Sequence, residues 1–258
     1  MILLMTGPPR TGSSALCRAL SMHDKILLTD EMGIFHDYNW KPNKKYPGKL
    51  LNFLKKPARP FLYPVFKKKG ISRSALEAFV ENQKPCSADV LKYMIRKSSP
   101  RPLIAGDKCP SSYLLRFDDV SRRADKFIFT MRDGRAVIAS QVRNWRRNFR
   151  LNRPTDHWMK PSIEGSVKLW LRDAKLVLKC FRRVRDRAII CRYEDFFDGK
   201  TDLFDSIGSF LEIDGVAREA RRWFKPVHLS SWQDEIPEID DKITTEFKSV
   251  LRDFGYEV

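Results

Sequence analysis

The sequence lacks the features that mark membrane-spanning, secreted and zinc-binding proteins. No apolar run approaches the roughly 18 residues that a transmembrane helix needs. The apolar start, Met1 to Met5, is short and has no basic leader, which argues against a signal peptide. The five cysteines are scattered without a CxxC pair, and there are only four histidines, so we expect neither a disulfide framework nor a metal site. If the chain is complete, these absences predict a cytoplasmic protein.

Negative charge is also scarce. Acidic residues number 32 and basic residues 49, which gives the 258-residue chain a net charge of +17. Such an excess predicts anionic partners, among them nucleic acid, a membrane surface, or a ligand that carries phosphate or sulfate.

No acidic residue occurs between Tyr38 and Leu76, a stretch that holds eleven basic residues and five prolines. Because so many prolines exclude a long helix, we interpret residues 38–72 as an irregular basic and aromatic insertion. It forms either a lid or docking surface, or a solvated loop. Five arginines further on are spaced by three and four residues, as on one face of a solvated helix: Arg143, Arg146, Arg147, Arg150 and Arg153.

What the sequence does contain is an alternation of short apolar runs and helical patterns. The runs predict strands at 2–5, 26–28, 103–105, 127–131 and 188–193, and the helical patterns lie at 13–22, 73–83, 134–145, 163–185, 202–211 and 216–224. Continuous apolar strands are typical of a parallel sheet that is covered on both faces. We therefore predict a single domain over residues 1–258, with a three-layer α/β/α fold of the P-loop type around a central parallel sheet.

The first strand leads through Gly7-Pro8-Pro9-Arg10-Thr11-Gly12-Ser13-Ser14 into the first helix. A helix N-terminus in this position presents backbone N–H groups to an anion. The two glycines have the spacing of the GxxxxGKS/T phosphate loop, but Ser13 stands where that loop has its lysine. The loop therefore predicts an anion site, with Arg10 as a clamp, and argues against nucleoside triphosphate hydrolysis.

A second motif follows the strand at 127–131. Arg132 comes directly after that strand, and Ser140 follows eight residues later, about two turns into the next helix. Ligands of open α/β sheets bind at the carboxyl ends of the strands. Arg132 and Ser140 could thus hold one phosphate between them.

These two motifs resemble those of the sulfotransferases that use 3′-phosphoadenosine 5′-phosphosulfate (PAPS). That family has a basic PxxGSS loop for the 5′-phosphosulfate, and a strand ending in Arg-Asp-Gly with a serine eight residues on for the 3′-phosphate. Residues 192–196 (RYEDF) and 106–110 (GDKCP) are similar to two further family segments. The glycines of the family's C-terminal GxxGxW element are missing here, and only Trp232 corresponds to it.

The resemblance implies that PAPS is the donor, that adenosine 3′,5′-bisphosphate (PAP) is the product, and that no metal is needed. It implies nucleotide contacts from Arg10, Thr11, Gly12, Ser13, Ser14, Arg132, Ser140, Tyr193 and Trp232. Tyr193 would lie at the adenine pocket. The acceptor, a hydroxyl or an amine, would attack sulfur in line with the departing 5′-phosphate.

An alcohol acceptor needs a general base. Glu31 is the first choice because it lies where relatives carry a glutamate base, His36 is the second, and Asp107 is the third. Asp107 could instead orient Lys108, which could reach the leaving group. A surface or helix-capping carboxylate is the ordinary alternative for Glu31.

Two other functions compete with sulfuryl transfer. One is a P-loop kinase of a small metabolite, which the missing lysine opposes. The other is a basic nucleic-acid-binding protein, although no nucleic-acid motif appears and we expect no nucleic acid as partner. The acceptor stays open among glycans, lipids, phenols and peptide tyrosines, and the basic insertion favours an anionic or membrane-associated one.

Overall fold

The computed structural model describes residues 1–35, 69–83, 85, 87–155, 158–197, 202–222, 232 and 236–258. His36 and residues 38–68 of the basic insertion lie outside the described residues.

Within the described residues, five short strands form one parallel sheet, as the apolar runs predict. They are β1 (Ile2–Thr6), β2 (Ile26–Asp30), β3 (Ile104–Lys108), β4 (Lys126–Met131) and β5 (Ala188–Arg192), in the spatial order β2-β3-β1-β4-β5. All four strand pairs are parallel, which confirms the predicted α/β fold.

Helices connect the strands. They are α1 (Ser13–Ser21), α4 (Arg73–Gln83), α5 (Ser87–Lys97), α6 (Ser112–Leu115), α7 (Phe117–Val120), α8 (Gly134–Arg150), α9 (Ile163–Arg183), α10 (Tyr193–Phe197), α11 (Leu203–Leu211), α12 (Val216–Arg221) and α14 (Thr245–Asp253). The described residues also form short 3₁₀ helices: η1 (Ser121–Arg123), η2 (Arg185–Arg187) and η3 (Pro237–Lys242).

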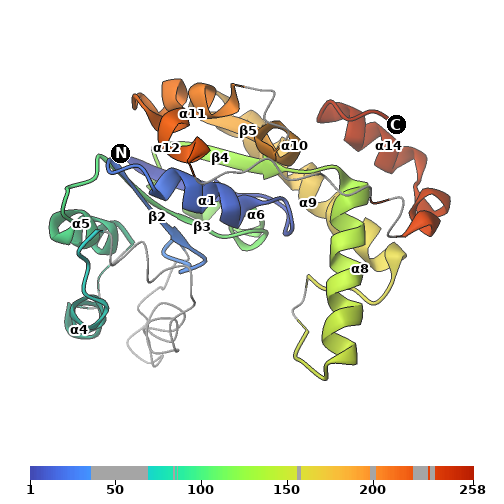
Figure 1. Ribbon diagram of the computed structural model, residues 1–258, viewed down its shortest axis with the longest axis horizontal. Helices are drawn as coiled ribbons and strands as arrows, with labels where there is room; N and C mark the ends of the chain where they lie inside the picture. The colour runs from blue at the N-terminus through green and yellow to red at the C-terminus, as the bar shows by residue number, and fades with distance from the viewer. Residues whose placement is uncertain are drawn as a thin grey trace.

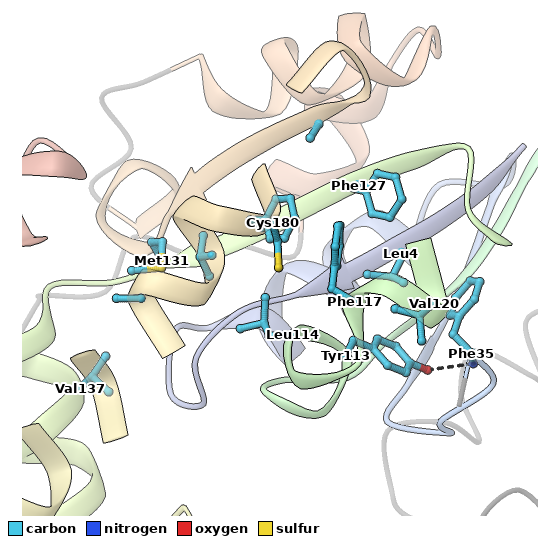
Figure 2. Packing of buried hydrophobic residues seen from close by; sticks show 14 of the residues in the cluster. Leu4, Phe35, Tyr113, Leu114, Phe117, Val120, Phe127, Met131, Val137 and Cys180 are labelled. Atoms are coloured by element: carbon cyan, nitrogen blue, oxygen red, sulfur yellow. Dashed lines mark hydrogen bonds between the residues drawn. The ribbon is translucent and has the colours of Figure 1, made fainter. Parts of the chain in front are cut away.

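The alternation of side chains along the strands produces a core on each face of the sheet. On one face, Leu3 and Ile128 pack with α1, α11 and α12. On the other, Leu4, Phe127 and Phe129 pack with residues of α6, α7 and α9. Figure 2 shows part of this second core, in which apolar rings and aliphatic side chains interleave. Because helices cover both faces of the sheet, a ligand can reach it at the ends of the strands.

The strand order places the site at the boundary between β1 and β4. β1 continues through α1 to β2 on one side of the sheet, whereas β4 continues through α8 and α9 to β5 on the other. In open α/β sheets, ligands bind at such a switch point, outside the carboxyl ends of the two strands. Helix α8 starts at this edge and extends away from the sheet (Figure 1).

Several boundaries differ from those predicted. β3 continues to Lys108 because its polar side chains find partners inside the protein, α5 and α14 were not anticipated, and α8 ends at Arg150, so Arg153 lies beyond the helix. In the described end of the basic insertion, Lys69 is buried, and its Nζ donates to the carbonyl oxygens of His23 (3.0 Å) and Asp24 (2.6 Å). Lys69 is thus an internal anchor and not part of a basic surface.

Candidate active site

The loop between β1 and α1 is held close to the sheet. Thr11 is fully buried, and its Oγ1 lies 2.8 Å from Oγ1 of Thr130 and donates to the carbonyl oxygen of Pro8 at 2.9 Å. A Cβ on Gly7 would lie 2.2 Å from the carbonyl oxygen of Thr130, so only glycine fits there. Contacts with Thr130 of β4 therefore hold the loop in place, and the N–H groups of the loop lie at the start of α1.

Gly12 is the N-cap of α1 and has a φ of 75°, in the left-handed region that glycine adopts without strain. A Cβ at this position would lie 2.4 Å from Cδ2 of Tyr193. The close approach brings the ring of Tyr193 against the phosphate loop. Two segments that the sequence suggested as nucleotide contacts are thus in direct contact with each other.

Arg10 lies at the top of this loop and contacts α8. Its Nε donates to Oγ of Ser140 at 2.9 Å, and its guanidinium lies 5.4 Å from the ring centroid of Trp158. Although part of Arg10 stays exposed, loss of solvation and then the positive charges of Arg132 and Arg143 lower its pKa. Positive charge is therefore concentrated where the two motifs meet.

Arg132 packs on the same tyrosine that contacts the loop. Its guanidinium lies 4.0 Å from the ring centroid of Tyr193, and its Nε is buried with no hydrogen-bond partner within the described part of the chain. A buried donor that makes no hydrogen bond costs free energy. An anion at this point would satisfy it, so the geometry fits a phosphate group.

Residues of α10 and of the C-terminus support the segment that carries Arg132. Glu194 accepts a hydrogen bond from the backbone N–H of Asp133 at 3.1 Å and one from the hydroxyl of Tyr256 at 3.0 Å. Burial raises the pKa of Glu194, although these hydrogen bonds oppose the rise. Arg192 makes two hydrogen bonds to Asp195, of 3.0 and 2.7 Å, as expected for a pair that fixes a strand end. The C-terminal segment thereby supports the segment that carries Arg132.

Lys108 lies at the end of β3, almost completely buried. Its Nζ is 2.5 Å from Oδ1 of Asp30, 2.9 Å from Oε1 of Glu31 and 2.8 Å from Oγ of Ser14. Burial alone would lower the pKa of Lys108, but the charges of Asp30 and Glu31 outweigh it and raise the pKa. Lys108 therefore remains protonated and connects the start of α1 to the candidate base.

Glu31 follows β2 in the left-handed conformation, with a φ of 61°. Its side chain is 34% exposed, and its backbone N–H donates to the carbonyl oxygen of Lys108 at 2.6 Å. The carboxylate is thus fixed by Lys108 yet open to solvent on one side, which is the arrangement that a proton acceptor for a bound substrate requires.

Asp107, the third candidate base, is placed differently from Glu31. It is fully buried and accepts hydrogen bonds from Oγ1 of Thr29 (2.5 Å), the hydroxyl of Tyr113, and the backbone N–H groups of Met32, Gly33 and Ile34 (3.2, 2.8 and 3.2 Å). Five donors occupy this carboxylate. Its geometry is that of an anchor for the loop that begins at Glu31.

Asp107 should make stability depend on pH. Burial raises the pKa of Asp107 from 3.8 to about 6, and the hydrogen bonds from Thr29 and Tyr113 oppose the rise. The native state therefore holds a proton between about pH 4 and pH 6 that the unfolded state has released. Folding stability should fall as pH rises through this window, by about 3 kcal/mol.

We expect Tyr113→Phe to lower the free energy of unfolding by about 1.5 to 3 kcal/mol at pH 8, where the hydroxyl donates to a charged carboxylate. At pH 5 the loss should be smaller, because Asp107 is then largely protonated. Urea unfolding at both pH values measures the difference. Tyr93→Phe is the control, since that ring stacks on Phe79 instead. Equal losses at the two pH values would contradict this account of Asp107.

The structure brings together most of the residues that the sequence singled out. The loop residues 10–14, Arg132, Ser140 and Tyr193 form one group, and Glu31 and Lys108 join it through Ser14. Trp232 packs against the core around α8 and α9, and its ring centroid lies 5.1 Å from the guanidinium of Arg135, three residues after Arg132. Sequence patterns did not reveal Asp30, Trp158 or Tyr256, whose partners Lys108, Arg10 and Glu194 are distant in the chain. They did not reveal Tyr113 either, although its partner Asp107 is six residues away.

A phosphate loop at a sheet edge, with a second arginine site beside it, defines a class of α/β proteins that bind phosphorylated ligands. The model of the Sulfotransferase family matches residues 3–217, and the chain belongs to the sulfotransferase family. Family and fold together support sulfotransferase activity.

Solved structures share the fold. The sulfotransferase domain of the olefin synthase from Synechococcus PCC 7002 aligns with a TM-score of 0.64 and 19% identity, over 100% of this chain and 95% of that one. Sulfotransferase STF9 from Mycobacterium avium aligns with a TM-score of 0.51 and 13% identity, over 98% of this chain and 75% of that one. No curated protein matches the sequence.

Two features are absent from the described residues. None of their helices is both long and apolar enough to cross a membrane. Nor do three or more His, Cys, Asp or Glu side chains gather there in a way that could hold a metal ion.

Proposed function

We propose that this sulfotransferase transfers the sulfuryl group of PAPS to a hydroxyl or amine acceptor. The observation that carries the proposal is the arginine site beside the phosphate loop. Arg132 has a buried Nε that finds no hydrogen-bond partner among the described residues, within a group that includes Tyr193, Arg10 and Ser140. A nucleotide with phosphate at both its 5′ and 3′ positions would occupy both the loop and this second site.

The loop would bind the 5′-phosphosulfate, through Arg10 and the N–H groups of residues 11–14 at the start of α1. Arg132 and Ser140 would bind the 3′-phosphate. Tyr193, which covers Gly12, would pack against the adenine. The hydrogen bond between Arg10 and Ser140 joins the two phosphate sites, so Arg10 could exchange this partner for an oxygen of the phosphosulfate.

In the transfer step, the acceptor oxygen attacks sulfur and forms the new S–O bond. The bond from sulfur to the bridging oxygen breaks, and its electron pair stays on the 5′-phosphate of PAP. The acceptor proton passes to the carboxylate of Glu31. Charge grows on the bridging oxygen, where Arg10 and the loop N–H groups can stabilise it without rearrangement.

Lys108 would act through Glu31 and Ser14. All three of its N–H donors have partners: Asp30, Glu31 and Ser14. This geometry favours a positioning role over the direct contact with the leaving group that we expected from the sequence. Asp107 would position the same carboxylate by anchoring the loop from Glu31 to Ile34.

A metabolite kinase is not favoured. Ser13 occupies the position of the phosphate-binding lysine, and the nearby Lys108 is neutralised by two carboxylates. The described part of the loop thus lacks the lysine that would hold the γ-phosphate of ATP, and its cation is Arg10, which bonds Ser140.

Thermal unfolding with nucleotides tests the donor. PAP at about 100 times its dissociation constant should add about 2.7 kcal/mol to the free energy of unfolding, a rise in Tm of about 5 to 10 °C for a protein of this size. ADP should give much less, because it lacks the 3′-phosphate. A shift only with ATP and magnesium would overturn the proposal, since the loop would then act as a kinase loop without its lysine.

A further inference from the structure

The far end of α8 differs from the rest of the described surface. On the whole described surface, only six large hydrophobic side chains are exposed. Two of them, Phe149 (70% exposed) and Leu151 (49%), lie at the end of this helix. Figure 1 shows that α8 extends past the sheet, so this end is far from the core that could have covered it. Isolated exposed apolar residues are ordinary, but two of them only two positions apart at a protruding helix end indicate a contact surface.

Arginines surround this pair. The α8 tip comprises Arg146, Arg147, Phe149, Arg150, Leu151 and Arg153, all of them exposed. Its four arginines make no ion pair with any carboxylate within the described ranges, and no acidic residue occurs between Asp133 and Asp156. The surface is therefore both basic and apolar.

Exposed arginines around an apolar end match the chemistry of an anionic lipid surface. Each arginine near such a surface contributes about 1 kcal/mol of attraction to lipid phosphates, and apolar side chains enter the boundary between headgroups and acyl chains. One face of the Phe149 ring is already covered by Trp145, at a centroid distance of 5.0 Å and an interplanar angle of 13°. That stacking leaves the ring poorly placed to insert between nucleobases, whereas its exposed edge can enter a lipid surface.

We propose that the α8 tip docks on an anionic phospholipid surface. The tip is continuous with the candidate active site, because Arg143 and Arg147 lie close enough to Arg10 for their charges to lower its pKa. Docking by this end would bring the arginine edge of the site toward the lipid headgroups. The proposal concerns binding only and does not depend on the identity of the donor or acceptor.

Vesicle sedimentation tests it with the full chain. We expect binding to phosphatidylcholine vesicles that contain about 30 mol% phosphatidylglycerol, and little binding to phosphatidylcholine alone. Arg146→Gln with Arg150→Gln should weaken the binding about 30-fold, as two arginines at about 1 kcal/mol each predict. Phe149→Ser should weaken it by a similar factor at low salt and at about 0.5 M salt, because salt screens the attraction of the arginines but not the apolar contribution.

The matched control is Arg182→Gln with Arg185→Gln, which removes the same charge at the end of α9. This control should bind within about twofold of the unchanged protein. Equal loss in both double variants would show attraction by net charge alone and would overturn the proposal. So would tighter, tip-dependent binding to a short duplex or single-stranded RNA than to the vesicles, which would assign the surface to nucleic acid. Thermal unfolding of each variant confirms that it is folded.

Discussion

Replacing Arg132 with alanine should weaken the binding of PAP about 100-fold and leave the binding of ADP within about threefold. A hydrogen bond to a charged group contributes about 1.5 to 3 kcal/mol, and 2.7 kcal/mol corresponds to this loss. The reason for the selectivity is that Arg132 would contact only the 3′-phosphate, which ADP lacks. Isothermal titration of both nucleotides measures the two affinities.

Arg132 also packs on Tyr193, so alanine could disturb the adenine pocket as well. Arg132→Lys separates the two effects, because lysine keeps the charge and loses the planar fork that binds phosphate in two places. We expect an intermediate loss of about tenfold for PAP. If both variants weakened the binding of PAP and of ADP equally, Arg132 would not contact the 3′-phosphate.

The phosphate loop and the arginine site could be predicted from the sequence because each is a short local pattern. A strand, a loop with glycines and a helix follow one another directly, and Arg132 and Ser140 are eight residues apart. Parallel strands align their carboxyl ends at one edge, so the fold class alone brings such loops together. The contact of Tyr193 with Gly12 is a consequence of the same alignment, since β5 ends at that edge.

The network around Lys108 could be predicted only in part. An apolar run suggested a strand that ends at Ala105, whereas β3 continues through Asp107 and Lys108, which are fully buried. Burial of these charged residues depends on partners far away in the chain: Glu31 is 77 residues from Lys108, and Ser14 is 94. Local hydropathy carries no information about such partners, so it ends the strand too early.

The support from the C-terminus was missed for the same reason. Tyr256 and Gly255 contact Glu194 and Arg192, about 60 residues earlier. The sequence showed that the glycines of the GxxGxW element are missing. It did not show that Gly255 and Tyr256 support the segment that carries Arg132. Trp232 contacts Arg135, and the support from Tyr256 and Gly255 adds a C-terminal contribution to the same segment.

Glu31→Gln should lower turnover by about two to four orders of magnitude while the dissociation constant of PAP changes less than about threefold. A positioned general base contributes a factor of this size. Glutamine keeps the oxygen that accepts from Lys108, so the network of Lys108, Asp30 and Ser14 should persist. Loss of turnover with unchanged donor binding is therefore the result that a base predicts and a purely structural carboxylate does not.

The assay follows the release of PAP from PAPS, first with water as acceptor and then with panels of glycans, lipids, phenols and tyrosine peptides. Glu238→Gln, an exposed carboxylate on η3, is the control and should match the unchanged protein. Near-normal turnover in Glu31→Gln would show that Glu31 is not the general base and would leave His36 as the next candidate. A weaker affinity for PAP together with a lower Tm would instead show that Glu31 has a structural role. Its ion pair with Lys108 would then be what stabilises the donor site.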